Sequence, residues 1–148
     1  MDLQSYMGDW YEIARFDAWG TKHVTNCTSK YYLEKSGDII VSDTCTGTFG
    51  WTYTTNGVAE VDPLYDDTSR LQVTFTSCMP AWSEYWIMAT NYAYSVVGNT
   101  ARTRLWILHR NRVMSNELYE RCVAIAKDHG FDTTKLVKTV HTGTESAV

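Results

Sequence analysis

Cys27 and Cys45 are the two side chains whose type and spacing most clearly permit chemistry. They lie in two predicted strands on either side of the turn Lys35-Ser36-Gly37. A hairpin centred on Ser36 places position 27 opposite position 45, and directly opposed residues of a non-hydrogen-bonded pair are near the separation that a disulfide needs. We expect this bond in an oxidising compartment. In the alternative, one of the two thiols faces a pocket and reacts with a bound molecule.

The other reactive side chains form no pattern typical of a catalytic or metal site. The four histidines show no metal-ligand spacing, and no phosphate-binding loop, nucleophile elbow or paired-carboxylate motif occurs. Cys122 lies on the apolar stripe of a predicted helix and should be a buried free thiol, whereas Cys78 has no evident partner. Glu12 should be a buried, inward carboxylate that pairs with a tyrosine. We therefore predict no catalytic residue, no metal ligand and no cofactor.

The composition is that of a folded chain of 148 residues that is rich in aromatic side chains. Six Trp, ten Tyr and four Phe residues are typical of strands and of apolar pockets. The net charge of −4 argues against nucleic acid as the main partner, because a phosphate backbone requires a basic face. The sequence has no run of about 18 apolar residues that could form a transmembrane helix. We predict a single domain covering residues 1–148.

Alternation of apolar and polar residues predicts eight strands in succession, separated by short turns. Their expected bounds are 10–16, 27–33, 38–45, 51–61, 71–77, 84–90, 92–97 and 104–110. Eight such strands most simply form an all-β, up-and-down antiparallel barrel, whose interior has room for one small ligand or for side chains alone. A C-terminal helix over 115–129, between the N-cap Ser115 and Gly130, should pack on the outer wall. A short edge strand over 136–142 follows.

The strand alternation also predicts which side chains face the interior of the barrel. The expected inward residues are Phe16, Ser29, Tyr31, Val41, Val73, Phe75, Leu105 and Ile107. Either Trp86 or Tyr85 joins them; periodicity alone does not decide between the two, and Trp86 is the chosen candidate. A wall of this composition selects an apolar ligand.

Three segments carry a resemblance to a known family. They are Gly8-Asp9-Trp10-Tyr11-Glu12-Ile13-Ala14, Tyr85-Trp86-Ile87-Met88-Ala89-Thr90-Asn91-Tyr92 and Leu105-Trp106-Ile107-Leu108-His109-Arg110. They resemble the three signature segments of the lipocalin family. The tail over 124–136 is similar to the branch that contains bacterial outer-membrane lipocalins, plant temperature-induced lipocalins and apolipoprotein D. The similarity extends over nearly the whole chain.

The resemblance implies roles for two further groups of residues. Gly8, Trp10 and Arg110 should be structural, with the Trp10 indole closing one end of the barrel and the Arg110 guanidinium stacked on it. The pocket mouth should lie at the loops 18–20, 47–50 and 79–82, so that Trp19, Phe49 and Trp82 surround the entrance as ligand contacts. In the alternative, these aromatic side chains cap a filled core.

The functional prediction is a non-enzymatic carrier that reversibly binds a small hydrophobic ligand, such as a fatty acid, a lysophospholipid or a similar lipid. The alternative is a cysteine-dependent lipid isomerase, or a protein that attaches a bilin chromophore covalently, on the same fold. A third interpretation is an interaction module with a collapsed interior. We expect a secreted or periplasmic monomer or homodimer whose signal peptide is absent from this sequence, with a cytoplasmic location and peripheral membrane association left open.

Overall fold

The structure is a computed structural model that describes residues 1–17, 24–75 and 81–142. All eight predicted barrel strands and the helix after them are present, whereas the short helix α1 and the 3-10 turn η1 are not predicted by the sequence analysis. In chain order, the elements are α1 (Leu3–Tyr6), β1 (Gly8–Phe16), β2 (Thr25–Leu33), β3 (Ile39–Thr46), β4 (Thr52–Val61), β5 (Arg70–Phe75), β6 (Ser83–Thr90), β7 (Tyr94–Gly98), β8 (Leu105–His109), α2 (Asn116–Asp128), η1 (Thr133–Lys135) and β9 (Leu136–Lys138).

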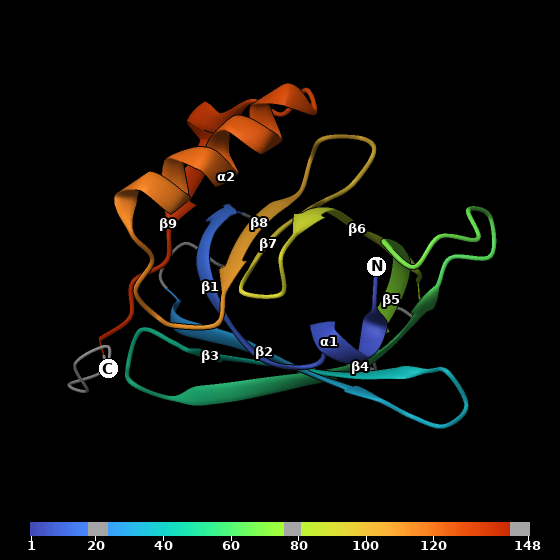
Figure 1. Cartoon of the computed structure of the whole chain (residues 1–148). Helices are drawn as coiled ribbons and strands as arrows, with labels where there is room; N and C mark the ends of the chain where they lie inside the picture. The colour runs from blue at the N-terminus through green and yellow to red at the C-terminus, as the bar shows by residue number, and fades with distance from the viewer. Residues whose placement is uncertain (18–23, 76–80, 143–148) are drawn as a thin grey trace.

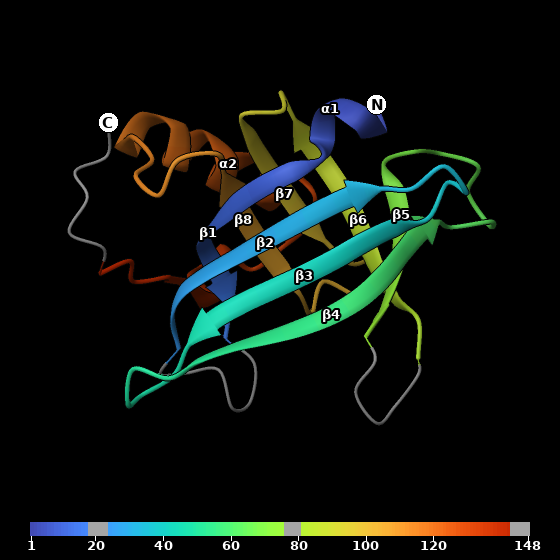
Figure 2. The same cartoon turned by 90° about the horizontal axis from the view of Figure 1, so that it is seen from below.

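Strands β1 to β8 form a closed antiparallel barrel. Each strand pairs with the next one in the sequence, and β8 pairs back with β1 to close the cylinder, while β9 adds to the free part of β1. Figure 1 looks into the barrel and shows α2 outside its wall, and Figure 2 shows α1 at the end opposite to the β3–β4 turn. The predicted all-β, up-and-down barrel with one C-terminal helix on its outer wall is therefore confirmed.

Two apolar clusters lie on the two sides of the barrel wall. The inner cluster includes Trp10, Ile39, Val41, Leu71 and Val73. The outer cluster lies between the wall and α2, and it contains Phe16, Leu105 and Ile107 together with Cys122 and Ala126 of the helix. The expected inward orientation of Phe16, Leu105 and Ile107 is therefore wrong.

A β-bulge explains why Phe16 faces outward. The pairing of β1 with β8 shifts register between Glu12 and Ala14. Residues beyond a bulge face the side opposite to the one that simple alternation predicts. Phe16 thus leaves the face on which Trp10 and Glu12 lie, and its ring packs 6.2 Å from that of Phe131, between ring centroids.

In β8, Leu105 and Ile107 face outward for a different reason. Because α2 covers the outer side of this strand, both of its faces are apolar, and the sequence pattern does not distinguish them. Trp106 and Leu108 face the interior, and Leu105 and Ile107 face the helix.

A cation–aromatic contact lies at the end of the barrel where β1 begins. The Trp10 side chain has no exposed surface, and its Nε1 donates a hydrogen bond to the Tyr6 carbonyl at 2.8 Å. The Arg110 guanidinium lies 3.8 Å from the centroid of the Trp10 ring and donates to the Asp9 carbonyl at 2.8 Å. Gly8 has φ +97°, and a Cβ there would lie 3.4 Å from Nη1 of Arg110, so this position favours glycine. These contacts join α1, β1 and the end of β8.

Helix α2 begins and ends as its sequence predicts. The Ser115 hydroxyl accepts a hydrogen bond from the Leu118 amide at 3.2 Å, and Gly130 follows the helix with φ +90°. Cys122 and Ala126 are fully buried against the barrel. Within the three described ranges, no helix has both the length and the apolar character needed to cross a membrane.

Candidate functional site

A cavity of about 480 Å³ lies inside the barrel. Ser83, Thr103 and Arg104 are exposed and belong to its wall, so the cavity meets solvent at the end where β6 and β8 begin. Tyr6 belongs to the wall at the other end. The remaining wall residues are Met7, Glu12, Cys27, Thr28, Ser29, Tyr31, Ile39, Val41, Asp43, Cys45, Ala59, Leu71, Val73, Phe75, Glu84, Tyr85, Asn99, Trp106 and Leu108.

Five predicted ligand contacts lie in this wall, and they come from three strands. Ser29 and Tyr31 belong to β2, Val41 belongs to β3, and Val73 and Phe75 belong to β5. Ser29 and Tyr31 are two positions apart, as are Val73 and Phe75, which is the period-2 spacing that strand alternation predicts. Their contact with a ligand stays a prediction.

Trp86 does not lie in the cavity wall, and its neighbour Tyr85 takes that place. The Trp86 ring faces outward, where the Arg70 guanidinium lies 3.9 Å from its centroid and the His129 ring lies 5.5 Å away, between centroids. Tyr85 on the inner face and Trp86 on the outer face are both half-buried aromatic side chains, which is why periodicity does not decide between them.

Two of the three aromatic residues that we expect around the mouth do not form part of the wall. Phe49 and Trp82 are 87% and 49% exposed, and neither lines the cavity. The predictions for Trp19 and Cys78 fall outside the described residues. Phe49 and Trp82 thus lie outside the cavity wall, and their contact with a ligand stays a prediction.

Sequence reasoning missed the polar side of the mouth. Glu84, Asn99, Thr103 and Arg104 belong to the wall. A signal was available: neighbouring strands of an up-and-down barrel alternate in direction, so the turn between β7 and β8 must lie at the same end as the β3–β4 turn.

A chain of hydroxyl groups lies at the inner part of the cavity. The Tyr6 hydroxyl is 2.8 Å from the Ser95 Oγ and 2.9 Å from the Tyr85 hydroxyl, which is in turn 2.9 Å from that of Tyr31. Burial raises the pKa of Tyr6 to about 12 and the pKa values of Tyr31 and Tyr85 well above their usual range. The hydroxyls therefore stay protonated at neutral pH and hold one another in place.

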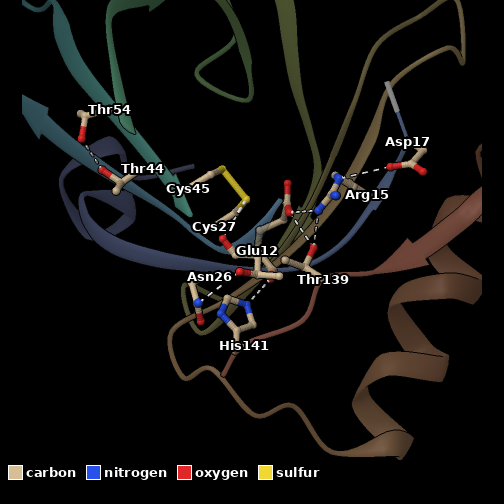
Figure 3. The surroundings of a disulfide bond; sticks show 11 residues. Glu12, Arg15, Asp17, Asn26, Cys27, Thr44, Cys45, Thr54, Thr139 and His141 are labelled. Atoms are coloured by element: carbon tan, nitrogen blue, oxygen red, sulfur yellow. Dashed lines mark hydrogen bonds and ion pairs between the residues drawn. A yellow bond between two sulfur atoms is a disulfide. The ribbon is translucent and has the colours of Figure 1, made fainter. Parts of the chain in front are cut away.

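Glu12 is a buried carboxylate, and its partner is Arg15 rather than the expected tyrosine. Nη1 of Arg15 lies 2.8 Å from Oε2 of Glu12, and the Thr139 hydroxyl donates to the same oxygen at 2.5 Å (Figure 3). The bulge between Glu12 and Ala14 explains this pairing, because it brings Arg15 to the face on which Glu12 lies.

Asp43 is a second carboxylate in the cavity wall. Burial raises its pKa to about 6; hydrogen bonding with Ser29 opposes this rise, and the nearby Glu12 charge adds to it. Its Oδ1 atom is buried and has no hydrogen-bond partner within the described residues, where Asp43 also takes part in no salt bridge. Part of the wall is thus acidic and incompletely paired.

The raised pKa of Asp43 gives a pH-dependent prediction for stability. The folded state holds this proton more tightly than the unfolded state, so the ionised form destabilises the fold, and stability is lost as pH rises from about 4 to about 6. We expect Asp43→Asn to be more stable than the native protein at about pH 8, by about 1–2 kcal/mol after allowance for solvent in the cavity. At about pH 4 the difference should shrink to about half a kcal/mol, because the folded carboxyl is then protonated and the unfolded one is near the midpoint of its titration.

Urea unfolding at the two pH values tests this expectation. Asp66→Asn is the matched control, because Asp66 lies exposed in the β4–β5 connection and its substitution removes the same charge far from the cavity. An Asp43→Asn variant that is no more stable than the native protein at about pH 8 would contradict the prediction.

The predicted disulfide joins Cys27 of β2 to Cys45 of β3, with the two Cα atoms 4.2 Å apart. Both residues belong to the cavity wall, and Figure 3 shows the bond close to Glu12. The disulfide prediction is confirmed, and in the bonded state neither sulfur is the thiolate that the isomerase and bilin alternatives require. Cys122 is a buried free thiol, and burial raises its pKa to about 11.

The fold and the site together define a class of protein, a closed β-barrel with an internal, largely apolar ligand cavity. A family model described as a lipocalin-like domain matches residues 1–141 of the chain. The chain therefore belongs to the lipocalin family, and its barrel is the hydrophobic ligand-binding barrel of that family.

Similar sequences come from plants, bacteria and animals, as the signature segments predict. The chain is 29% identical over 152 residues to temperature-induced lipocalin-1 of Arabidopsis thaliana, covering 97% of this chain and 81% of the relative. It is 32% identical over 146 residues to the outer membrane lipoprotein Blc of Citrobacter freundii, covering 92% and 77%. Apolipoprotein D of Mus musculus is 28% identical over 147 residues, covering 93% and 76%.

Solved structures support the fold independently of close sequence similarity. Lobster apocrustacyanin A1 superposes with a TM-score of 0.79 at 19% identity, covering 96% of this chain and 81% of that one. Insecticyanin from the tobacco hornworm Manduca sexta has a TM-score of 0.79 at 19% identity, covering 96% and 82%. At these identities the likeness establishes the barrel and nothing about the ligand.

Proposed function

We propose that the protein is a carrier that reversibly binds one small hydrophobic molecule inside its barrel. The observation that carries this proposal is the cavity of about 480 Å³, which lies within the range that small-molecule sites occupy. Its deep part is walled by Ile39, Val41, Ala59, Leu71 and Val73, all of them buried and apolar.

The expected affinity follows from the apolar area that a ligand would bury. Burial stabilises by about 25 cal/mol per Å², so a ligand that buries a few hundred Å² gains several kcal/mol, less the entropic cost of association. This predicts micromolar affinity for a loosely fitting apolar molecule. Tighter binding requires a match of shape or a polar anchor, and Ser29, Tyr31 and Tyr85 supply polar groups along the wall.

We place the protein in an oxidising compartment outside the cytoplasm. The Cys27–Cys45 disulfide supports this location, since reducing compartments keep such thiols apart. The name of the Citrobacter freundii relative, an outer membrane lipoprotein, is consistent with it. Transient contact with a membrane surface would give such a carrier access to lipids.

We propose binding rather than catalysis as the activity. The two cysteines that could have served as nucleophiles at the cavity are joined to each other, and the buried tyrosine hydroxyls hold their protons at neutral pH. The carboxylate of Glu12 forms an ion pair with Arg15 and accepts a hydrogen bond from the Thr139 hydroxyl.

Filling the cavity tests the carrier proposal. Ala59 is buried in the middle of β4 with its side chain in the cavity wall, so Ala59→Trp should occupy the ligand's space. We expect the native protein to bind the neutral fluorescent probe N-phenyl-1-naphthylamine saturably. We expect Ala59→Trp to weaken that binding by about tenfold or more. The indole would cover apolar wall surface, of the area of at least one side chain, that the probe otherwise contacts.

Ala124→Trp on the exposed side of α2 is the matched control and should bind the probe like the native protein. Near-ultraviolet circular dichroism reports whether Ala59→Trp keeps the native fold, and Ala59→Phe provides a smaller filling residue if overpacking is too costly. A native protein that neither binds the probe saturably nor shows any bound apolar molecule in native mass spectrometry would refute the proposal.

A further inference from the structure

The charged groups in the cavity wall are mostly acidic. Glu12, Asp43 and Glu84 belong to the wall, and Arg104 is the basic residue among its described members. Arg104 is exposed at the mouth, whereas the other three are buried or half-buried. A ligand that enters the barrel therefore meets negative charge, and in a poorly solvated cavity such charge acts more strongly than it does in water.

Two of the three carboxylates already have partners. Glu12 is held by Arg15 at 2.8 Å and by the Thr139 hydroxyl at 2.5 Å. Oε1 of Glu84 accepts a hydrogen bond from the Thr100 hydroxyl at 2.7 Å, close to the solvent at the mouth. These two carboxylates do not require a ligand to satisfy them.

Asp43 is the carboxylate that is incompletely paired. Ser29, which lies opposite it on β2, hydrogen-bonds with this carboxylate but leaves one of its oxygens unpaired. The buried Oδ1 of Asp43 accepts no hydrogen bond within the described residues, and no described Lys, Arg or His forms a salt bridge with it. The titratable groups around it are Glu12 on β1 and Tyr31 on β2, and neither of them is a cation. In the β3–β4 ladder, the residue opposite Asp43 is the uncharged Thr55. A buried acceptor left unpaired is costly, and a buried carboxylate without a counter-charge is more so.

The position of Asp43 along β3 separates an apolar region from a polar one. The inward residues of this strand, from the closed end toward the mouth, are Ile39, Val41, Asp43 and Cys45. An apolar body lying against Ile39 and Val41 would therefore place a head group at Asp43. Along this strand the wall therefore changes from apolar in the deep part to acidic nearer to the mouth.

We propose that the ligand is an amphipathic amine, whose protonated nitrogen donates a hydrogen bond to the Asp43 carboxylate while its apolar part fills the deep cavity. This proposal rests on the carrier function proposed above. A fatty acid would instead bring a second carboxylate next to Asp43 and Glu12, and like charges at close range are repulsive. An alcohol of the same length would donate a hydrogen bond without supplying the charge.

Isothermal titration calorimetry with decylamine, decanoic acid and 1-decanol tests the proposal, because these probes share one chain and differ in head group. At about pH 8 the amine is a cation and the acid an anion. We expect decylamine to bind at least about tenfold more tightly than decanoic acid, which is the scale of one charge-assisted hydrogen bond. Lowering the pH to about 4.5 should weaken decylamine binding, because Asp43 then gains a proton while the amine stays charged.

Two variants locate the effect at one carboxyl group. Asp43→Asn should weaken decylamine binding by about tenfold at about pH 8, strengthen decanoic acid binding and leave 1-decanol binding nearly unchanged. Asp66→Asn should change none of the three affinities, since it removes the same charge from an exposed loop at the closed end. Near-ultraviolet circular dichroism of both variants verifies the native fold.

The failures of the two proposals are distinguishable. If all three probes bind equally well, or if decanoic acid binds best, the amine proposal is overturned while the carrier function stands. If decylamine binds best but Asp43→Asn does not weaken it, the assignment to Asp43 is overturned. If neither these probes nor N-phenyl-1-naphthylamine binds, the carrier function and the amine proposal fall together.

Discussion

Replacing Trp10 by alanine should lower the free energy of unfolding by about 3–5 kcal/mol, which is the cost of truncating a fully buried aromatic side chain. The indole has no exposed surface, and its ring packs 4.9 Å from the Tyr6 ring, between centroids. It also carries the Arg110 guanidinium at 3.8 Å and donates a hydrogen bond to the Tyr6 carbonyl. Truncation removes all of these contacts and leaves a cavity at the closed end of the barrel.

Urea unfolding followed by far-ultraviolet circular dichroism measures this effect without relying on tryptophan fluorescence. Trp51→Ala is the matched control, because Trp51 is 77% exposed and its loss should change stability by no more than about 0.5 kcal/mol. Trp10→Phe should lie between the two, since it keeps much of the apolar volume but loses the hydrogen bond and part of the cation–aromatic contact. Equal stabilities for Trp10→Ala and Trp51→Ala would show that the closed end does not depend on the indole.

The barrel could be predicted from the sequence because its strands are short, sequential and separated by turn residues. In the β2–β3 hairpin, the turn at Gly37 fixed the register, and Leu33 does pair with Ile39. Local patterning was sufficient there because the two strands are consecutive and a short turn sets which residues face each other. The same local reasoning located α2, whose N-cap Ser115 and following Gly130 mark both ends.

The assignment of side chains to the cavity was less successful, because it depends on events that alternation does not reveal. The bulge in β1 turns the Phe16 side chain to the outer face and places Arg15 on the inner face, where it pairs with Glu12. In β8, both faces are apolar because α2 covers the outer one, so alternation wrongly predicts that Leu105 and Ile107 face inward. A pattern of period 2 identifies a strand, but it identifies the inner face only where the outer face is exposed to solvent and therefore polar.

Other polar residues of the site had no local signal in the sequence. Tyr6 reaches the hydroxyl chain from α1, a four-residue helix too short to predict from periodicity. Thr139 contacts Glu12 across a sequence separation of 127 residues. In the sequence, Asp43 is not distinguished from the other polar residues of an alternating strand. That no described Lys, Arg or His forms a salt bridge with it is a property of the closed barrel, which alternation along one strand does not reveal.

The double substitution of Cys27 and Cys45 by serine should lower the free energy of unfolding by about 3 kcal/mol. The disulfide closes a loop with a sequence separation of 18, and most of its effect comes from restricting the unfolded chain. Urea unfolding of the two proteins measures the difference. A reductant should destabilise the native protein by a similar amount and leave the double variant unchanged, whereas the free Cys122 is common to both.

The structure also predicts where the native fold weakens when this bond is lost. The β2–β3 ladder is interrupted between Thr25 and Thr28, next to Cys27, so the covalent link holds the two strands together where their hydrogen bonds are irregular. Hydrogen exchange of the Cys45 and Thr46 amides should therefore accelerate in the double variant, while that of Ile40, in the regular part of the hairpin, should change only with global stability. Uniform acceleration along the whole hairpin would mean that the bond acts on the unfolded chain alone and does not hold the cavity wall.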